Sequence, residues 1–133
     1  MIKRTLVCVV LCGSMMAGSL LAHHSLAGVY DMKKDQSLTG SVEKLQFVNP
    51  HGSLTLSITN ADNTTTEWVF TLGSATGLAQ RGIGKTGPNA LHVGDKIKVT
   101  FLPAVSGKPL GFLKTVTMPD GRVITISGGQ PTD

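Results

Sequence analysis

The sequence predicts a mainly β fold with five to six short antiparallel strands and one short helix between the third and fourth strands. Residues 54–58 and 96–102 alternate apolar and polar side chains with a period of two, as strands with one buried face do. Clusters of turn-forming residues separate the apolar segments. After residue 22, helix signals are convincing in one segment only, residues 74–81.

The first two strands form a predicted hairpin. Apolar positions in residues 37–48 change parity midway, and a β-bulge near Glu43 and Lys44 would return both sets to one face. Asn49–Gly52 follows as a turn, because it contains a proline without an amide donor and a glycine that tolerates positive φ. Residues 54–58 then form the second strand.

The third strand covers residues 66–71, which are rich in β-branched and aromatic side chains. Ser74 can cap a short helix that continues to about Arg81, and Gly82 can provide its left-handed termination. The fourth strand is predicted over residues 96–102.

The remaining elements follow a loop. Residues 103–109 contain two prolines and a glycine and break the strand pattern. We expect a fifth strand over residues 111–118, a turn over 119–122, and a sixth strand that ends at Ile126. Residues 127–133 have no apolar side chain, and we expect a disordered tail there.

Three strands, a short helix and two further strands is the element order of the OB-fold. The bulge suits a first strand that bends around such a barrel. We therefore predict a small antiparallel OB-like barrel of five to six strands over residues 23–126, with the sixth strand extending an edge. An open antiparallel sheet or a sandwich is the alternative, because element order does not determine closure.

Residues 1–22 have the features of a signal peptide. Lys3 and Arg4 precede an apolar segment that contains small residues and is marginal in length for crossing a bilayer. We favour cleavage after Ala22, which would leave His23 as the N-terminus; the rival cleavage follows Ala27. The expected product is a periplasmic domain without a membrane span.

Composition limits the class of partner. Removal of Lys3 and Arg4 would reduce the net charge of the chain from +4 to about +2, and the remaining basic residues are scattered. A nucleic-acid groove would instead need clustered Lys and Arg with stacking aromatic residues, so we expect no nucleic-acid partner. Both cysteines, Cys8 and Cys12, lie in the predicted signal peptide, so the mature domain would have no disulfide.

Three histidines are candidate metal ligands. With His23 at the N-terminus, its amine and imidazole could chelate Cu(II), which prefers nitrogen ligands in a flat arrangement. His24 and His51 would supply further nitrogens if the terminus folds back over the first hairpin. The alternative is that the His pair is exposed without a role and that His51 stabilises its turn. We interpret His92 as an exposed loop residue.

Asn49 and His51 are also candidates for binding a small ligand, because the loop between strands one and two of an OB barrel borders the usual binding face. The structural alternative, which we favour for Asn49, is that it bonds neighbouring backbone amides. Trp68 alternates with Phe70, which favours core packing over a ligand platform. No nucleophile with an adjacent base can be nominated, so we do not expect an enzyme.

Several short motifs together resemble a known protein family: Ala22-His23-His24-Ser25, Tyr30-Asp31, Asn49-Pro50-His51, Trp68, Gly94-Asp95, Pro103-Ala104 with Gly107, and Pro119-Asp120-Gly121-Arg122. The family is a group of small exported bacterial proteins described only as a domain of unknown function. The resemblance spans nearly the whole predicted mature domain and implies export and this domain extent.

The sequence therefore suggests an exported periplasmic, non-enzymatic binding or accessory module with copper as the candidate metal. The alternative is a protein-interaction module that docks on a membrane or periplasmic partner through an exposed edge strand or the loop 103–109.

Overall fold

The computed structural model describes residues 27–127 of the chain. The predicted signal peptide, His23 and His24 lie outside the described residues, as do residues 128–133 of the predicted tail. Between residues 27 and 127, no helix has the length and apolar character needed to cross a membrane.

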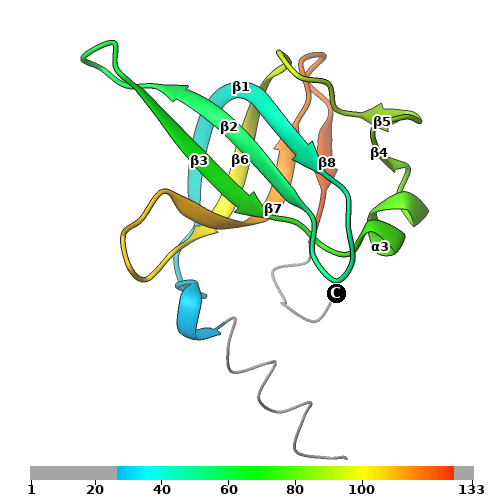
Figure 1. Cartoon of the computed structure of the whole chain (residues 1–133), viewed down its shortest axis with the longest axis horizontal. Coiled ribbons are helices and arrows are strands. Elements are labelled where there is room, and N and C mark those ends of the chain that lie inside the picture. The colour runs from blue at the N-terminus through cyan, green and yellow to red at the C-terminus, as the bar shows by residue number, and fades with distance from the viewer. Residues whose placement is uncertain (1–26, 128–133) are drawn as a thin grey trace, which may run out of the picture.

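Five strands close into a barrel, and a sixth extends it (Figure 1). The barrel strands are β1 (Gln36–Gln46), β2 (Ser53–Thr59), β3 (Thr65–Thr71), β6 (Lys96–Pro103) and β7 (Leu110–Thr117). Neighbours pair antiparallel in the order β3-β2-β1-β6-β7, and β3 also pairs with β7 in parallel. Helix α3 (Ala75–Gln80) lies between β3 and β6 in the chain. The predicted OB-like barrel is confirmed, with a closing pair that is parallel.

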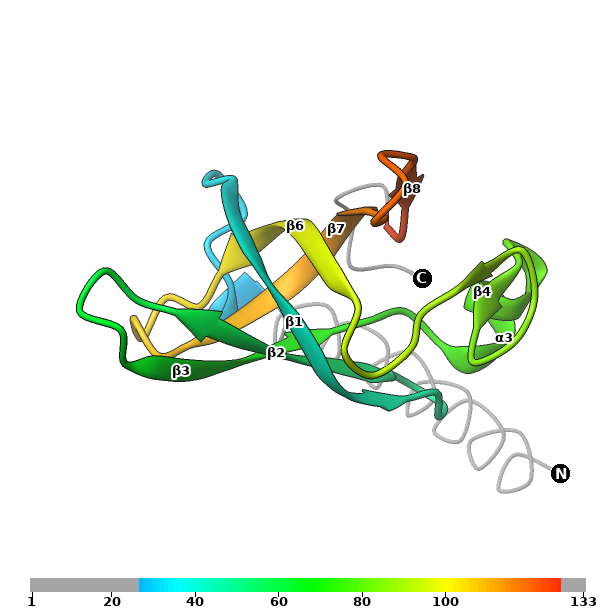
Figure 2. The same cartoon turned by 90° about the horizontal axis from the view of Figure 1, so that it is seen from above.

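Strand β1 is shared by two neighbours and must bend between them (Figure 2). Its first half pairs with β6 and its second half with β2, and the two halves meet at Ser41. The register with β2 shifts between Val42 and Lys44, which confirms the predicted bulge. A Cβ at Gly40 would lie 2.6 Å from the Ser57 carbonyl oxygen. The backbones therefore approach more closely at Gly40 than any side chain would permit.

The parallel seam that closes the barrel is short, because it joins only Val69–Thr71 to Leu110–Phe112. Gly111 lies at its centre, and a Cβ there would lie 2.5 Å from a ring carbon of Phe101. The missing side chain lets Phe70 and Phe101 pack edge to face beneath the seam, with ring centroids 4.9 Å apart. Closure of the barrel thus depends on a glycine at this position.

The inward faces of the strands form one hydrophobic core. The alternation predicted for the second and fourth strands is confirmed, with buried positions at Leu54, Leu56, Ile58, Ile97, Val99 and Phe101. Trp68 packs against this core, as predicted, with its ring stacked on Phe70 at a centroid distance of 6.0 Å. The Trp68 side chain is nevertheless only partly buried, so one part of it faces solvent.

A second, smaller apolar cluster lies on the outside of the seam. Tyr30 packs there with Leu102 and Phe112, and its ring centroid is 5.8 Å from that of Phe112. The Tyr30 hydroxyl makes a 2.7 Å hydrogen bond with Oγ1 of Thr71, a seam residue of β3. Tyr30 therefore contacts both strands that close the barrel.

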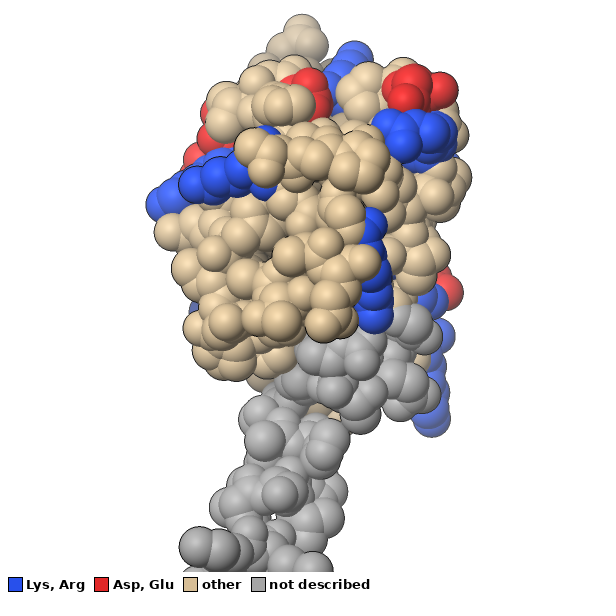
Figure 3. Space-filling model, turned by 90° about the vertical axis from the view of Figure 1, so that its right-hand side faces the viewer, with Lys and Arg blue, Asp and Glu red and all other residues tan. Residues whose placement is uncertain are grey.

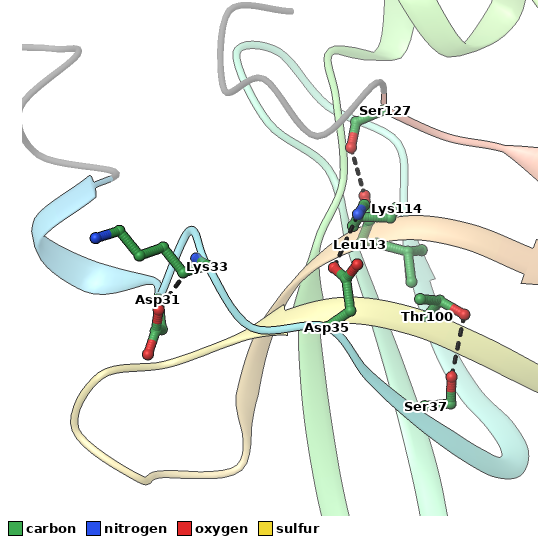
Figure 4. Close-up of polar contacts among 8 residues, drawn as sticks. All are labelled: Asp31, Lys33, Asp35, Ser37, Thr100, Leu113, Lys114 and Ser127. Atoms are coloured by element: carbon green, nitrogen blue, oxygen red, sulfur yellow. Dashed lines mark hydrogen bonds and ion pairs between the residues drawn. The ribbon is translucent and has the colours of Figure 1, made fainter.

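Polar contacts attach the rest of the N-terminal segment to the barrel (Figure 4). Nζ of Lys114 on β7 donates to Asp35 at 2.8 Å, just before β1 begins. The hydroxyls of Ser37 and Thr100 lie 3.2 Å apart across β1 and β6. The segment that precedes β1 is thus held along the outside of β6 and β7.

Helix α3 follows the predicted signals. The Ser74 hydroxyl accepts a hydrogen bond from the Gly77 backbone N–H at 3.1 Å, which satisfies one of the free donors of the first turn. Leu78 is buried against the core, and Gly82 has the predicted positive φ of 71°. Two short parallel strands, β4 (Ile83–Gly84) and β5 (Asn89–Ala90), connect the helix toward β6.

The sixth strand, β8 (Val123–Thr125), pairs with the second half of β7, beyond the half that pairs with β3. Arg122 stabilises its turn, because the Arg122 backbone N–H and guanidinium both donate to Asp120 and hold the pKa of that carboxyl below its ordinary value. The sequence places Ser127 in a disordered tail, but in the structure this residue is buried and its hydroxyl donates to the Leu113 carbonyl oxygen. The folded domain therefore includes this residue.

We predict that Gly111→Ala destabilises the protein by about 1–3 kcal/mol, the usual cost of overpacking a well-filled core. Gly73→Ala is the matched control, because a Cβ at Gly73 would meet no atom within 4 Å. Urea unfolding of both variants measures the difference. Equal stability of the two variants would show that the seam tolerates a side chain.

The contribution of the hydrogen bond between Tyr30 and Thr71 to the free energy of unfolding should also be measurable. Tyr30→Phe and Thr71→Val should each cost about 0.5–1.5 kcal/mol, the net value of one hydrogen bond, and the double variant should cost less than the two added together. A double-mutant cycle in urea gives the coupling energy. Strict additivity would mean that the hydroxyl contact contributes nothing.

Candidate functional site

The turn between β1 and β2 carries the candidate residues that fall within the structure. It is held against the connection from β3 to α3: the Gly52 N–H donates to the Gly73 carbonyl at 3.1 Å, and the Leu72 N–H donates to the Gly52 carbonyl at 2.9 Å. The Ala75 N–H donates to the Val48 carbonyl at 3.3 Å. The backbone on both sides of the turn is therefore fixed, while its tip is open to solvent.

Asn49, Pro50 and His51 form that exposed tip. Within residues 27–127, the side chains of Asn49 and His51 have no hydrogen bond or ion pair. The expectation that Asn49 bonds neighbouring backbone amides is therefore wrong. The His51 side chain likewise makes no hydrogen bond to its turn within the described residues. The polar atoms of both side chains remain available to a ligand.

The described residues do not assemble a complete metal site. They contain no group of three or more His, Cys, Asp and Glu side chains placed to hold an ion. His51 is thus the candidate ligand that the structure places, while His23 and His24 lie outside the described residues.

His92 has a separate environment in the loop before β6. Its side chain is 68% exposed, as expected for a loop residue, and its Nδ1 lies 3.7 Å from Oδ2 of Asp95. The same carboxylate oxygen accepts a hydrogen bond from the His92 backbone N–H at 2.9 Å. His92 therefore has a local partner, whereas His51 has none among the described residues.

Apolar grooves lie near the turn, where β1 ends and the helix begins. One, of about 370 Å³, is lined by Phe47 together with Ala79 and Ile83, and a neighbouring one of about 350 Å³ contains Leu45 and Leu91. The face of the molecule on this side is mostly uncharged, with a few Lys and Arg side chains across it and acidic groups near its edges (Figure 3). These grooves are open and shallow, and no polar residue predicted as a ligand lines them.

A different cleft, of about 390 Å³, lies beside the loop between β6 and β7. Trp68 lines it together with charged and polar residues from the start of the domain and from the loop. Lys34, Gln36 and Lys108 line the same cleft, but isolated polar residues near a turn carry no local pattern that would identify them from the sequence. The closeness of two distant chain segments produces this cleft.

Comparison with known proteins identifies a family and nothing more specific. The chain matches a family model described as a family of unknown function, DUF6152, over residues 9–114. No curated protein and no solved structure matches the chain significantly. The match covers more than half of the sequence and agrees with the resemblance carried by the His pair and the Asn-Pro-His turn. This protein therefore belongs to the DUF6152 family of unknown function.

Proposed function

We propose that this protein is an exported periplasmic binding module without catalytic activity, which binds Cu(II) through His23, His24 and His51. The free, exposed imidazole of His51 on a fixed turn is the observation that carries the proposal. Asn49 lies at the tip of the same turn, where its exposed side chain is available to a ligand. Export rests on the charged, apolar and small-residue regions of the first 22 residues.

The chemistry of the donor set favours copper. A free N-terminal amine and the imidazole of His23 form a chelate of two nitrogens, and two further imidazoles would complete a planar set. Reference pKa values of about 7.7–8.0 for the amine and about 6.5 for imidazole make both groups available to a metal near neutral pH. Metal binding therefore requires the loss of few protons. His51 also has no partner among the described residues that the metal would have to replace.

The position of the N-terminal segment supports this arrangement. The Tyr30 hydroxyl makes a hydrogen bond with Thr71. Thr71 pairs across the sheet with Ser53, which follows His51 by two residues. Tyr30, six residues after His24 in the sequence, thus contacts a strand end that supports the turn. His24 precedes Ala27, the first described residue, by three residue steps of up to about 3.5 Å each.

We predict that the processed protein, with His23 as its first residue by intact mass, binds one Cu(II) with a visible absorption band. His51→Ala should weaken binding about ten-fold, or about 1.4 kcal/mol. An extra alanine placed before His23 should have an equal or larger effect, because it moves the free amine away from the imidazole. His92→Ala is the matched control and should bind as the parent does.

The outcome that contradicts the copper proposal is specific. If the double variant His23→Ala, His24→Ala binds copper as tightly as the parent, the terminus is not the site. If intact mass shows a chain that begins at Gly28, both histidines are absent and the proposed chelate does not exist.

A second candidate function is a protein-interaction module that docks on a membrane or periplasmic partner. Two exposed valines favour it, because they lie on the loop 103–109 and on the edge strand β8: Val105 is 64% exposed and Val123 is 65% exposed. Exposed apolar residues are common singly, so their position on these two segments is what supports the idea.

This candidate predicts that a partner captured from periplasmic extract in the presence of a chelator is lost with Val105→Asp or Val123→Asp. Val93→Asp is the matched control, because Val93 is 69% exposed but lies in the loop before β6. If all three variants reduce capture equally, the adhesion is nonspecific. If none of them reduces capture, neither segment is the docking surface.

A further inference from the structure

The cleft beside Trp68 lies toward the end of the barrel away from α3. Along the inward face of β3, Trp68 precedes Phe70 and Leu72, and α3 begins soon after Leu72. The cleft walls come from the segment before β1, from the start of β1 and from the loop between β6 and β7. Its volume of about 390 Å³ is within the range of small-molecule sites.

Backbone hydrogen bonds hold these two walls together. The Asp31 N–H donates to the Pro103 carbonyl at 2.8 Å, and the Val105 N–H donates to the Val29 carbonyl at 2.8 Å. Tyr30 and Ala104 form a β-bridge between the same segments. The cleft is therefore preformed, and a ligand would not have to order its walls.

Trp68 gives the cleft a rigid aromatic surface. Its ring stacks on Phe70 with an interplanar angle of 14°, and its centroid is 5.4 Å from that of Phe101. The indole N–H has no hydrogen-bond partner among residues 27–127 and is not sealed from solvent. Trp68 thus offers a flat apolar surface and a free hydrogen-bond donor.

The charges on the cleft walls favour an anion. Asp31 is 3.4 Å from Nζ of Lys34, so these two charges compensate each other. Lys108 has no ion pair within the described part of the chain. Gln36 adds an exposed amide that can donate a hydrogen bond. One positive charge is therefore uncompensated beside the aromatic surface.

We propose that this cleft binds a small planar organic anion, such as an aromatic carboxylate. Its ring packs against the Trp68 indole, and its carboxylate pairs with Lys108 and accepts from the Gln36 amide. The site is independent of the proposed copper site, because it contains no histidine and lies by Trp68 rather than by the turn at His51.

The test uses 2-naphthoate and the neutral isostere 2-naphthamide as probes of the full processed protein, with EDTA present to exclude metal binding. The sequence has one tryptophan, so the single indole N–H cross-peak in an ¹H–¹⁵N spectrum reports on Trp68. Naphthoate should shift this cross-peak in a saturable titration. Lys108→Glu should weaken naphthoate binding about five-fold or more, as expected for loss of a partly exposed ion pair, and should leave naphthamide binding unchanged.

Lys85→Glu is the matched control, because it makes the same charge change at the grooves beside α3. It should alter naphthoate affinity less than two-fold. The proposal is overturned if the indole cross-peak does not respond to millimolar naphthoate, or if Lys85→Glu weakens binding as much as Lys108→Glu. Equal loss of naphthoate and naphthamide binding in Lys108→Glu would also overturn it, since the lysine would then act without recognising the charge.

Discussion

The parallel contact between β3 and β7 is the constraint on which the rest of this structure depends. Without this contact the remaining strand pairs form an open antiparallel sheet. Only three residues on each strand pair to close that sheet into a barrel. Such a short seam needs support on both sides. Inside the barrel, Gly111 lets Phe70 and Phe101 pack directly beneath it; outside, Tyr30 packs on Phe112 and bonds to Thr71. Closure therefore results from packing across the seam more than from its few backbone hydrogen bonds.

The segment before β1 connects this closure to both proposed sites. Tyr30 supports the seam, Asp31 and Lys34 contribute to the cleft, and the candidate copper ligands His23 and His24 precede them in the chain. A ligand that binds only when this segment is in place must stabilise the closed barrel by linkage. Binding at either site and stability of the seam are thus expected to rise together.

The two proposed sites use different chemistry at different positions along β3. The turn between β1 and β2, which is held against the residues that follow β3, presents polar atoms on a fixed backbone and suits a metal that takes nitrogen ligands. The cleft beside Trp68 presents the indole ring and the unpaired side chain of Lys108, which suits a flat anion. A small barrel can support both because its strands hold the ends rigid while the loops and the N-terminal segment supply the functional groups.

Local signals in the sequence are enough to predict most strands and the helix of this protein. Period-two alternation predicts β2 and β6, the parity change predicts the bulge at Glu43, and Ser74 with Gly82 predicts the bounds of α3, because each signal depends on a residue and its near neighbours. Element order favours the OB-like barrel over an open sheet or a sandwich, although it does not determine closure. The parallel seam, the outward packing of Tyr30 and the cleft that brings Lys34 together with Lys108 are visible only in the folded chain. These features join residues far apart in the chain, and a local pattern cannot specify which distant residue lies opposite.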